Sequence, residues 1–372
     1  MKWWFLAHAA PVTIIAPRPP PVTGQSAYSL YLEDRLRIHG LETLSLPGRS
    51  DRDGWRGYAN KLLCSIGVAA RLALGPKRET VFIVLDGGIG LVFDFIFLLV
   101  LRVRGFGKVL LSHHSFAYID KKSTLMSLVV RLAGKTAFHI FLCSKMNDEF
   151  QMIYGRRFQN LVVSNARRTQ LNTGLGSSLA KPTHFTLGFI SNISFDKGIA
   201  EYFDLIEMLL KEDHNIYGLI AGPAASDDLG LYLKERIARC GGRVEWLGPL
   251  YGDEKQAFLS RLSVLVFPTK YVNEAQPNVL FESLSHGVPT MTIARGCIDE
   301  DMTGSGSLVA LSTESFLTEA LPYVKTLIEH HQEGHANAAS LQAASHFTSI
   351  HNASSQAEVK LVELMLSKAS KN

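Results

Sequence analysis

The chain has 372 residues, enough for two ordinary domains that each bury a core of their own. Hydrophobic residues make up 47% of it and charged residues 19%, which excludes a disordered chain. The net charge is +4, but residues 1–165 hold 21 Lys and Arg against 11 Asp and Glu, while the remainder is acidic. This asymmetry indicates different partners for the two halves. Either the basic half meets an anionic membrane or acceptor, or its basic residues merely solvate surface helices.

The cellular location and the classes of partner follow from weaker signals. Residues 1–7 briefly look like a signal peptide, but the apolar stretch breaks at Pro11 without a cleavage site. The four cysteines are scattered, with no short spacing of the metal-binding kind, which is typical of a reducing cytoplasm. No interleaving of basic and aromatic residues is present, so nucleic acid is not an expected partner. We expect a cytoplasmic protein, located at the inner face of the membrane if the basic half binds lipid.

In the first half, short apolar runs alternate with helical stretches, a pattern that predicts a parallel sheet covered by helices. Strands are expected near 12–16, 80–85, 108–112, 138–142 and 161–164, and helices near 26–39, 55–73, 90–104, 121–134 and 145–155. Residues 89–101 are very apolar but too short to span a bilayer, and they contain Asp94. They predict a buried helix or, because Arg102, Arg104 and Lys108 follow, a helix that dips into a membrane surface.

The second half repeats the same alternation after a linker. Residues 165–182 are rich in Gly, Ser, Thr and Asn, as linkers are. Strands are then expected near 184–190, 216–221, 244–247, 264–267 and 289–293, with helices near 198–211, 228–240, 253–261, 277–286 and 314–331, and an amphipathic helix near 355–370. The fold class is therefore α/β, with two doubly wound domains facing each other across a cleft. We place the domains at 1–168 and 183–345, with the C-terminal helix in 346–372 packing back on the first.

Two carboxylates eight residues apart, Glu274 and Glu282, stand at the start of a predicted helix. Pro277 and Asn278 separate an irregular loop from the apolar helical run, and Pro is favoured in the first turn of a helix. A helix start presents free N–H groups and a positive dipole end, which suit a phosphate. Two acids beside an anion site are typical of a ligand that carries hydroxyls next to a phosphate, as a sugar nucleotide does.

Other candidates lie at the ends of predicted strands. Lys197 and Gly198 follow the first strand of the second half, where a lysine at a helix start can hold a diphosphate or can simply be solvated. Turn chemistry alone is adequate to explain the turns at residues 222–223 and 248–251, and the alternative is that the backbone of 248–251 meets a nucleotide base. In the first half, the strand ends lead to four residues that could line the cleft: Gly24, Gln25, His114 and Ser115, with His113 as a second histidine. No third ligand with suitable spacing makes these histidines a metal site.

Taken in order, these pieces resemble the retaining glycosyltransferases of family 4, which have the GT-B fold of two facing Rossmann-like domains. The matching runs are residues 20–26, 114–115, 141–144, 162–165, 195–198, 219–222, 246–248, 266–269, 274–282 and 286–289. The resemblance covers roughly residues 10–345, and the two spaced glutamates are its most specific element.

The resemblance implies that the second domain binds a nucleotide-sugar donor and the first a saccharide or lipid-linked acceptor. Glu282 would hold the ribose hydroxyls, Glu274 the donor sugar, and Lys197 the diphosphate. The donor would also meet the N–H groups of Asn278, Val279 and Leu280, and the backbone at Pro249 and Leu250. His114, or else His113, would touch the donor sugar or the acceptor, with Gly24, Gln25 and Ser115 nearby. The implied reaction is hexosyl transfer with retention and without a metal or other cofactor, in the synthesis of a cell-surface polysaccharide or glycolipid.

One departure from the family concerns the diphosphate. Most members have Arg five residues before the lysine, whereas this chain has Asn192, so either another cation, Lys270 or Arg295, compensates or the diphosphate is bound more weakly. Two alternatives to a transferase remain: a sugar-nucleotide epimerase of the same fold, and a non-catalytic GT-B scaffold that binds a saccharide.

Overall fold

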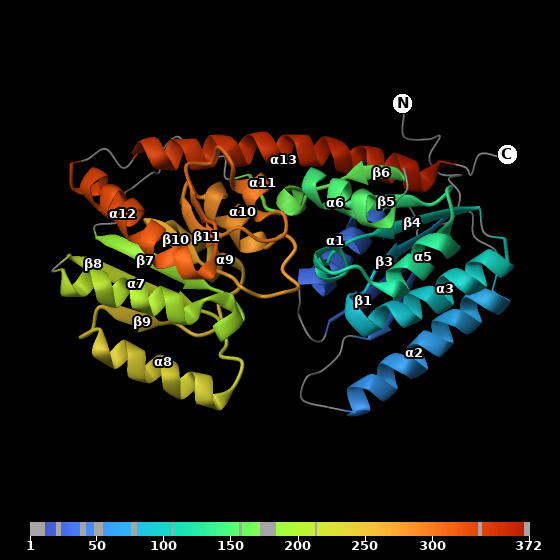
Figure 1. Ribbon diagram of the computed structural model, residues 1–372, viewed down its shortest axis with the longest axis horizontal. Coiled ribbons are helices and arrows are strands. Elements are labelled where there is room, and N and C mark those ends of the chain that lie inside the picture. Colours follow the sequence, from blue (N-terminus) through green and yellow to red (C-terminus); the bar gives the residue numbers. More distant parts are fainter. Residues whose placement is uncertain are drawn as a thin grey trace. The chain divides into compact units, whose positions relative to one another are not determined.

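The computed structural model describes residues 12–19, 24–37, 42–47, 55–75, 80–105, 107–155, 158–171, 184–212, 214–333 and 337–367. These residues belong to two compact units (Figure 1). Unit 1 extends to Ser164 and resumes at Ser354, and unit 2 comprises Asn165–Ala353.

Unit 1 contains a six-stranded parallel sheet in the order β2-β1-β3-β4-β5-β6. Its strands are β1 (Val12–Arg18), β2 (Glu42–Pro47), β3 (Thr80–Val84), β4 (Lys108–Ser112), β5 (Phe138–Phe141) and β6 (Gln159–Val162). Its helices are α1 (Gly24–Arg37), α2 (Trp55–Leu74), α3 (Leu91–Val103), α4 (Ala117–Asp120), α5 (Thr124–Ala133) and α6 (Ser144–Tyr154). Strands β1, β3, β4 and β5 are mostly apolar and buried, as inner strands of a parallel sheet covered on both faces must be.

Unit 2 contains a second six-stranded parallel sheet, in the order β12-β11-β10-β7-β8-β9. Its strands are β7 (Phe185–Ile190), β8 (Ile216–Ala221), β9 (Val244–Trp246), β10 (Val264–Phe267), β11 (Thr290–Ile293) and β12 (Leu308–Ala310). Its helices are α7 (Ile199–Lys211), α8 (Asp227–Arg239), α9 (Gly252–Ser260), α10 (Asn278–Ser285), α11 (Ile298–Met302) and α12 (Thr313–Gln332). The strand order reverses between β7 and β10, which is the doubly wound arrangement.

The predicted class of two parallel-sheet α/β units is confirmed, and each of the ten predicted strands lies within a few residues of an observed one. Two edge strands were not predicted, β2 and β12, nor were the short helices α4 and α11. The C-terminal helix is longer than expected, because α13 extends over Asn337–Leu366. Residues 20–23 of the predicted cleft loop and 172–183 of the linker lie outside the described residues, and Asn165–Arg168 form a short 3-10 helix.

The second part of α13 packs on unit 1. Leu361 and Met365 lie in the same buried cluster as residues of α1, β1 and β3. Lys108, at the start of β4, donates to the backbone carbonyls of Leu364 at 3.0 Å and Ser367 at 2.7 Å. These contacts satisfy the end of the helix, whose last carbonyls have no partner within it.

His113 is a core residue of unit 1, so its interpretation as a residue that lines the cleft is wrong. Its side chain is fully buried, with Nδ1 3.0 Å from the Tyr118 hydroxyl and Nε2 2.9 Å from Nδ1 of His139. The ring also stacks on Phe141. Burial, together with the charges of His139 and His114, holds the pKa of His113 well below its usual range. Burial lowers the pKa of His139 to about 3.

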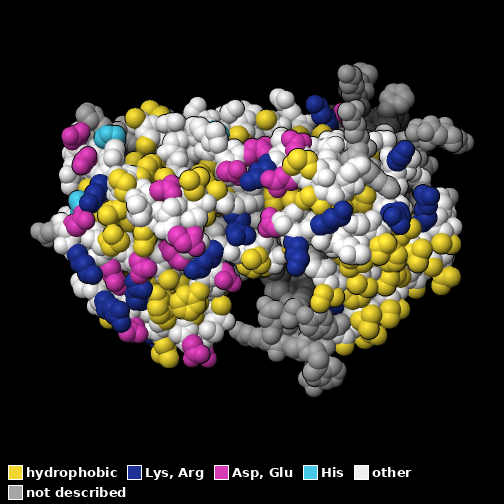
Figure 2. Space-filling model, viewed as in Figure 1, with side chains coloured by type: hydrophobic (Ala, Val, Ile, Leu, Met, Phe, Trp, Pro, Cys, Tyr) yellow, Lys and Arg dark blue, Asp and Glu magenta, His cyan; other side chains and the backbone are white. Residues whose placement is uncertain are grey.

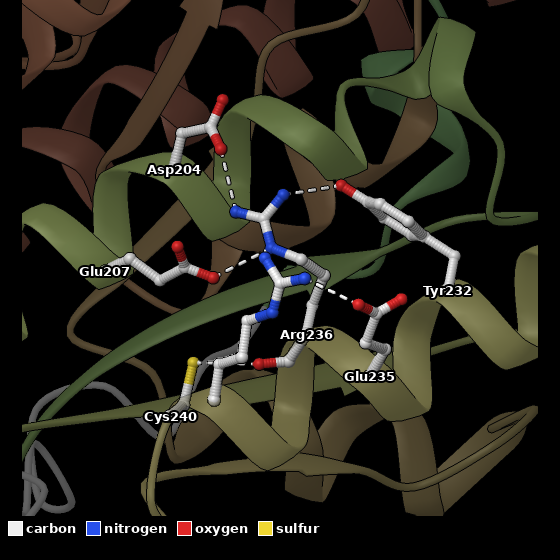
Figure 3. Close-up of polar contacts among 7 residues, drawn as sticks. Asp204, Glu207, Tyr232, Glu235, Arg236 and Cys240 are labelled. Carbon is white, nitrogen blue, oxygen red and sulfur yellow. Dashed lines mark hydrogen bonds and ion pairs between the residues drawn. The ribbon is translucent and has the colours of Figure 1, made fainter.

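An ion cluster joins two helices of unit 2 (Figure 3). Arg236 of α8 reaches α7, where it donates to Asp204 at 2.7 Å and to Glu207 at 2.8 Å, and it also contacts the Tyr232 hydroxyl at 2.6 Å. Arg239, one turn further along α8, makes only an exposed pair with Glu235 of its own helix. Arg236 therefore connects α8 to α7, whereas the pair of Arg239 lies within α8.

We expect Arg236→Met to lower the free energy of unfolding of unit 2 by about 2 kcal/mol, because it leaves charged acceptors on α7 without their donor. The matched Arg239→Met should change it by less than about 0.5 kcal/mol, since exposed pairs contribute little. Urea unfolding followed by circular dichroism measures both. Equal effects of the two substitutions would contradict the assigned role.

Unit 1 should lose stability as the pH falls from about 6.5, the usual pKa of histidine, toward 3. His113 and His139 have lowered pKa values in the folded state, so the unfolded chain binds more protons throughout this range. The measurement is the free energy of unfolding as a function of pH. His139→Gln should reduce the slope by up to about 1.4 kcal/mol per pH unit. An unchanged slope would show that these histidines do not titrate on unfolding.

Candidate functional site

The candidate site lies at the carboxyl edge of the unit 2 sheet, where the strand order reverses between β7 and β10. Loops that follow neighbouring strands diverge at such a point and leave room for a ligand. Here the loop after β7 carries Lys197 in the 3-10 helix Phe195–Lys197, and the loop after β10 carries Glu274. The two loops are joined, since the Lys270 N–H donates to the Asp196 carbonyl at 2.8 Å.

Lys197 and Glu274 form an ion pair across the two loops. The Thr269 hydroxyl donates to the same carboxylate oxygen of Glu274 at 3.2 Å, and the Lys197 ammonium lies 4.6 Å from the centre of the Tyr271 ring. Both charged side chains are mostly buried, with 21% of Lys197 and 12% of Glu274 exposed. The site therefore places a cation, Lys197, next to an anion, Glu274. This arrangement suits a ligand that carries a negative charge close to hydroxyl groups.

Two glycines let the backbones approach at this edge. Gly198 has φ +89°, and a Cβ there would lie 2.4 Å from the Pro268 carbonyl oxygen. Gly296, after β11, has φ +58°, and a Cβ there would lie 2.6 Å from the Glu274 carbonyl oxygen. Any side chain at either position would push the loops apart.

The loop between Glu274 and α10 is fixed by Gln276. Its side-chain oxygen accepts from the Asn165 N–H at 2.7 Å, and its amide donates to both carboxylate oxygens of Asp301 at 3.0 and 2.8 Å. Burial raises the pKa of Asp301 well above its usual range. The role of Gln276 could not be read from the sequence, although it stands between Glu274 and Glu282, because its partner Asp301 is 25 positions away and stands in no recognisable motif.

Helix α10 begins at Asn278, with Pro277 as its N-cap residue rather than inside its first turn. The N–H of Leu280 already donates to the Pro277 carbonyl at 3.3 Å, and Leu280 is buried. Of the three expected phosphate donors, Asn278 and Val279 are therefore the better placed. The side chain of Asn278 accepts a hydrogen bond from Arg168 at 3.3 Å.

Glu282 lies in the second turn of α10 and pairs with Lys255 of α9 at 2.6 Å. The sequence analysis did not single out Lys255. Helix α9 follows the turn that contains Pro249, which is exposed, and Leu250, which is half-buried against the core cluster. Glu282 is about four-fifths buried, so its carboxylate is oriented by this pair.

The cations expected to compensate for Asn192 differ in their surroundings. Asn192 itself is exposed. Lys270 pairs with Glu201 of α7 at 2.6 Å, so a ligand would have to compete with that carboxylate for its charge. Arg295 is half-buried beside Gly296, which touches the backbone of Glu274. Arg295 is therefore the better candidate.

In unit 1, four of the predicted residues lie at the carboxyl edge of the sheet. The Gln25 amide donates to the Leu85 carbonyl at 2.8 Å, and Gly24 begins α1 and is exposed. His114 is half-buried, with Nε2 2.9 Å from the Ser112 hydroxyl and its ring 4.3 Å from that of Tyr28. Ser115 is buried, and its hydroxyl accepts from the Ala117 N–H at 3.2 Å.

A cluster of two acids and one lysine follows β3 in the same unit. Asp86 pairs with Lys61 at 2.6 Å, and its backbone N–H donates to Asp94 at 2.9 Å. Burial and the charge of Asp86 raise the pKa of Asp94 well above its usual range. Among the described residues, no three His, Cys, Asp or Glu side chains gather in a way that could hold a metal ion.

Comparison with known proteins finds a family model that matches most of unit 2. Residues 184–324 match the family described as Glycosyl transferases group 1. The search of curated protein sequences found no match.

Solved structures match nearly the whole chain. HepE of Anabaena in complex with UDP-glucose has a TM-score of 0.65 at 16% identity, covering 94% of this chain and 99% of its own. Sucrose-phosphate synthase of Thermosynechococcus elongatus has a TM-score of 0.69 at 12% identity, covering 96% and 99%. WaaG, a glycosyltransferase involved in lipopolysaccharide biosynthesis, has a TM-score of 0.62 at 12% identity, covering 94% and 99%. At this identity the likeness establishes the fold, which is GT-B. The group 1 match over unit 2, on a chain of this fold, identifies the protein as a glycosyltransferase enzyme.

Proposed function

We propose that this enzyme is a retaining transferase of family 4 that moves a hexose from a nucleotide sugar to a saccharide or lipid-linked acceptor without a metal. The observation that supports this most is the joining of Lys197 and Glu274 beside the start of α10. A lysine and helix N–H groups suit the diphosphate of the donor, and a carboxylate next to them suits the hydroxyls of its sugar.

Each donor-site residue has a role in this proposal. Lys197 and the N–H groups of Asn278 and Val279 neutralise the diphosphate as it leaves, which stabilises the transition state. Glu274 accepts hydrogen bonds from the donor sugar. Glu282, oriented by Lys255, accepts from the ribose hydroxyls, and the backbone at 249–250 meets the base.

The transfer step needs no protein nucleophile. The bond between the anomeric carbon and the diphosphate oxygen breaks while the acceptor oxygen attacks the same face of the sugar. The proton of the acceptor hydroxyl passes to the leaving phosphate oxygen. The protein then contributes position and charge, which are the larger effects in such transfers.

The acceptor is assigned to unit 1, with Gly24, Gln25, His114 and Ser115 as contacts. HepE binds UDP-glucose and WaaG takes part in lipopolysaccharide biosynthesis. These two neighbours support UDP-glucose as the first donor to test, and an acceptor that belongs to a cell-surface polysaccharide or glycolipid. The basic charge of the first half supports an acceptor at an anionic membrane surface, on the cytoplasmic side in this proposal, and nucleic acid is not among the proposed partners.

We expect Glu274→Gln to reduce transfer and donor hydrolysis by about 100-fold or more while nucleotide binding is retained, because Glu274 acts on the sugar alone. Glu282→Gln should instead weaken binding of the nucleoside diphosphate by about tenfold. Thermal shift with UDP, GDP and ADP measures binding, since a ligand of the native state raises apparent stability. Product analysis with each nucleotide sugar measures turnover.

Glu245→Gln, an exposed site on β9, is the matched control and should change neither quantity. No stabilisation by any nucleotide and no turnover would contradict the proposal. A donor sugar altered in the absence of an acceptor would identify an epimerase instead.

Arg295→Gln should weaken binding of the nucleoside diphosphate by about tenfold, because the position of Asn192 supplies no charge to the phosphates. Lys270→Gln should leave binding unchanged, since Lys270 is paired with Glu201. Isothermal titration of both variants with the diphosphate found by thermal shift decides between them. A larger loss for Lys270→Gln would reverse the assignment.

A further inference from the structure

Helix α2 of unit 1 exposes a stripe of large apolar side chains. Leu62, Leu63, Ile66 and Leu74 are 49%, 66%, 57% and 87% exposed. Their spacing places them on one side of the helix, opposite Ser65, Val68 and Leu72, which are buried. Leucines and isoleucines at a helical period are normally the buried side, so α2 is apolar on two faces.

Helix α3 also exposes a stripe of large apolar side chains. Val92, Ile96, Leu99 and Val103 are exposed and follow each other at intervals of four, three and four residues. From Leu91 to Leu101 every side chain that is not buried is apolar. The sequence left open whether residues 89–101 form a buried helix or a helix that dips into a membrane surface. In the structure one face of this segment is exposed.

The two stripes lie side by side. Helices α2 and α3 pack on each other, and Arg104 ties their ends by donating to the carbonyls of Ala73 and, at 3.0 Å, Gly75. Figure 2 shows the resulting patch of hydrophobic side chains over these helices. We call it the α2–α3 apolar surface. A contiguous exposed area of this kind marks a docking site on a soluble protein.

The charges around this surface have one sign. Arg71 of α2, Arg102 at the end of α3 and Arg131 of the neighbouring α5 are all exposed. Asp94 is the only acidic residue in α2, α3 and α5, and it is buried. The surface therefore presents apolar side chains with cations beside them and no exposed anion within its three helices.

We propose that the α2–α3 apolar surface docks unit 1 on an anionic lipid bilayer, with both helices lying in the plane of the interface. Apolar stripes would enter the acyl boundary and the arginines would meet lipid phosphates, which is how interfacial amphipathic helices bind. Within the described residues, no helix has the length and apolar composition to cross a bilayer. The occupant is a bilayer rather than a second copy of the chain, because two copies of this surface would bring arginine against arginine. The inference concerns a partner and does not depend on the identity of the donor.

The test is flotation of the full chain with vesicles of phosphatidylglycerol or of phosphatidylcholine. The wild type should float with phosphatidylglycerol and lose binding as salt rises, since lipid charge is screened. The double variant Leu63→Gln with Val103→Gln should lower the partition coefficient at least about tenfold. Arg71→Gln with Arg102→Gln should lower it by about tenfold for the anionic vesicles alone.

The matched control is Leu231→Gln with Leu311→Gln, at 65% and 82% exposed positions of unit 2, which should float like the wild type. Thermal unfolding of each variant in the absence of lipid confirms that it folds. Equal flotation of the Leu63/Val103 variant and the control would overturn the proposal. So would a wild type that binds no vesicle but forms a dimer which the Leu63/Val103 variant loses. Because flotation needs neither nucleotide nor turnover, its failure is distinct from failure of the proposed transfer.

Discussion

The ion pair between Lys197 and Glu274 is the contact on which the donor site depends, because it joins the loops on the two sides of the strand reversal. Two charges withdrawn from water are costly unless further partners satisfy them. Thr269 and Tyr271 supply those partners here. In the proposed function, a diphosphate that reaches Lys197 would replace Glu274 as its anion, so the lysine would exchange one negative partner for another. The carboxylate released by that exchange is then available to the hydroxyls of the sugar, and donor binding itself would prepare Glu274 for its role.

The loop that carries Glu274 is held from behind by Gln276 and by the chain that follows β11. Gln276 connects the Asn165 backbone to Asp301, whose pKa is raised by burial. Gly296 lets the chain after β11 press on the Glu274 carbonyl. This packing matters because a carboxylate that acts by position loses its effect when its backbone shifts by an ångström. In the proposed function Lys197 and Glu274 face the donor, while Gln276 and Gly296, which fix the loop, are buried.

The sequence predicted every central strand and the edge strands β6 and β9, but not the edge strands β2 and β12. Central parallel strands are buried on both faces and appear as apolar runs, whereas β2 (Glu42–Pro47) has a mixed composition and β12 (Leu308–Ala310) is only three residues long. Lys197, Glu274 and Glu282 could be placed because each stands at a strand or helix end, where local signals are strong. Gln276–Asp301 and Lys255–Glu282 could not be paired, since each contact joins residues about 25 positions apart. The interpretation of His113 was wrong for the same reason. Its position at a strand end favours a functional role, and its place in the core depends on a contact with His139, which is distant in the sequence.

Part of the excess of basic residues in the first half of the chain lies on three neighbouring helices of unit 1. Helices α2, α3 and α5 contribute cations with a single buried acid, and two of them add the exposed apolar stripes. Apolar surface of this extent promotes aggregation, and flanking charge of one sign opposes it, because copies of the chain repel each other. The same charge attracts an anionic bilayer, against which the apolar stripes can be buried without repulsion. Since the acceptor is assigned to unit 1, docking this unit would raise the local concentration of a lipid-linked acceptor around it. The donor, which is soluble, needs no such device, and unit 2 carries the acidic half of the chain.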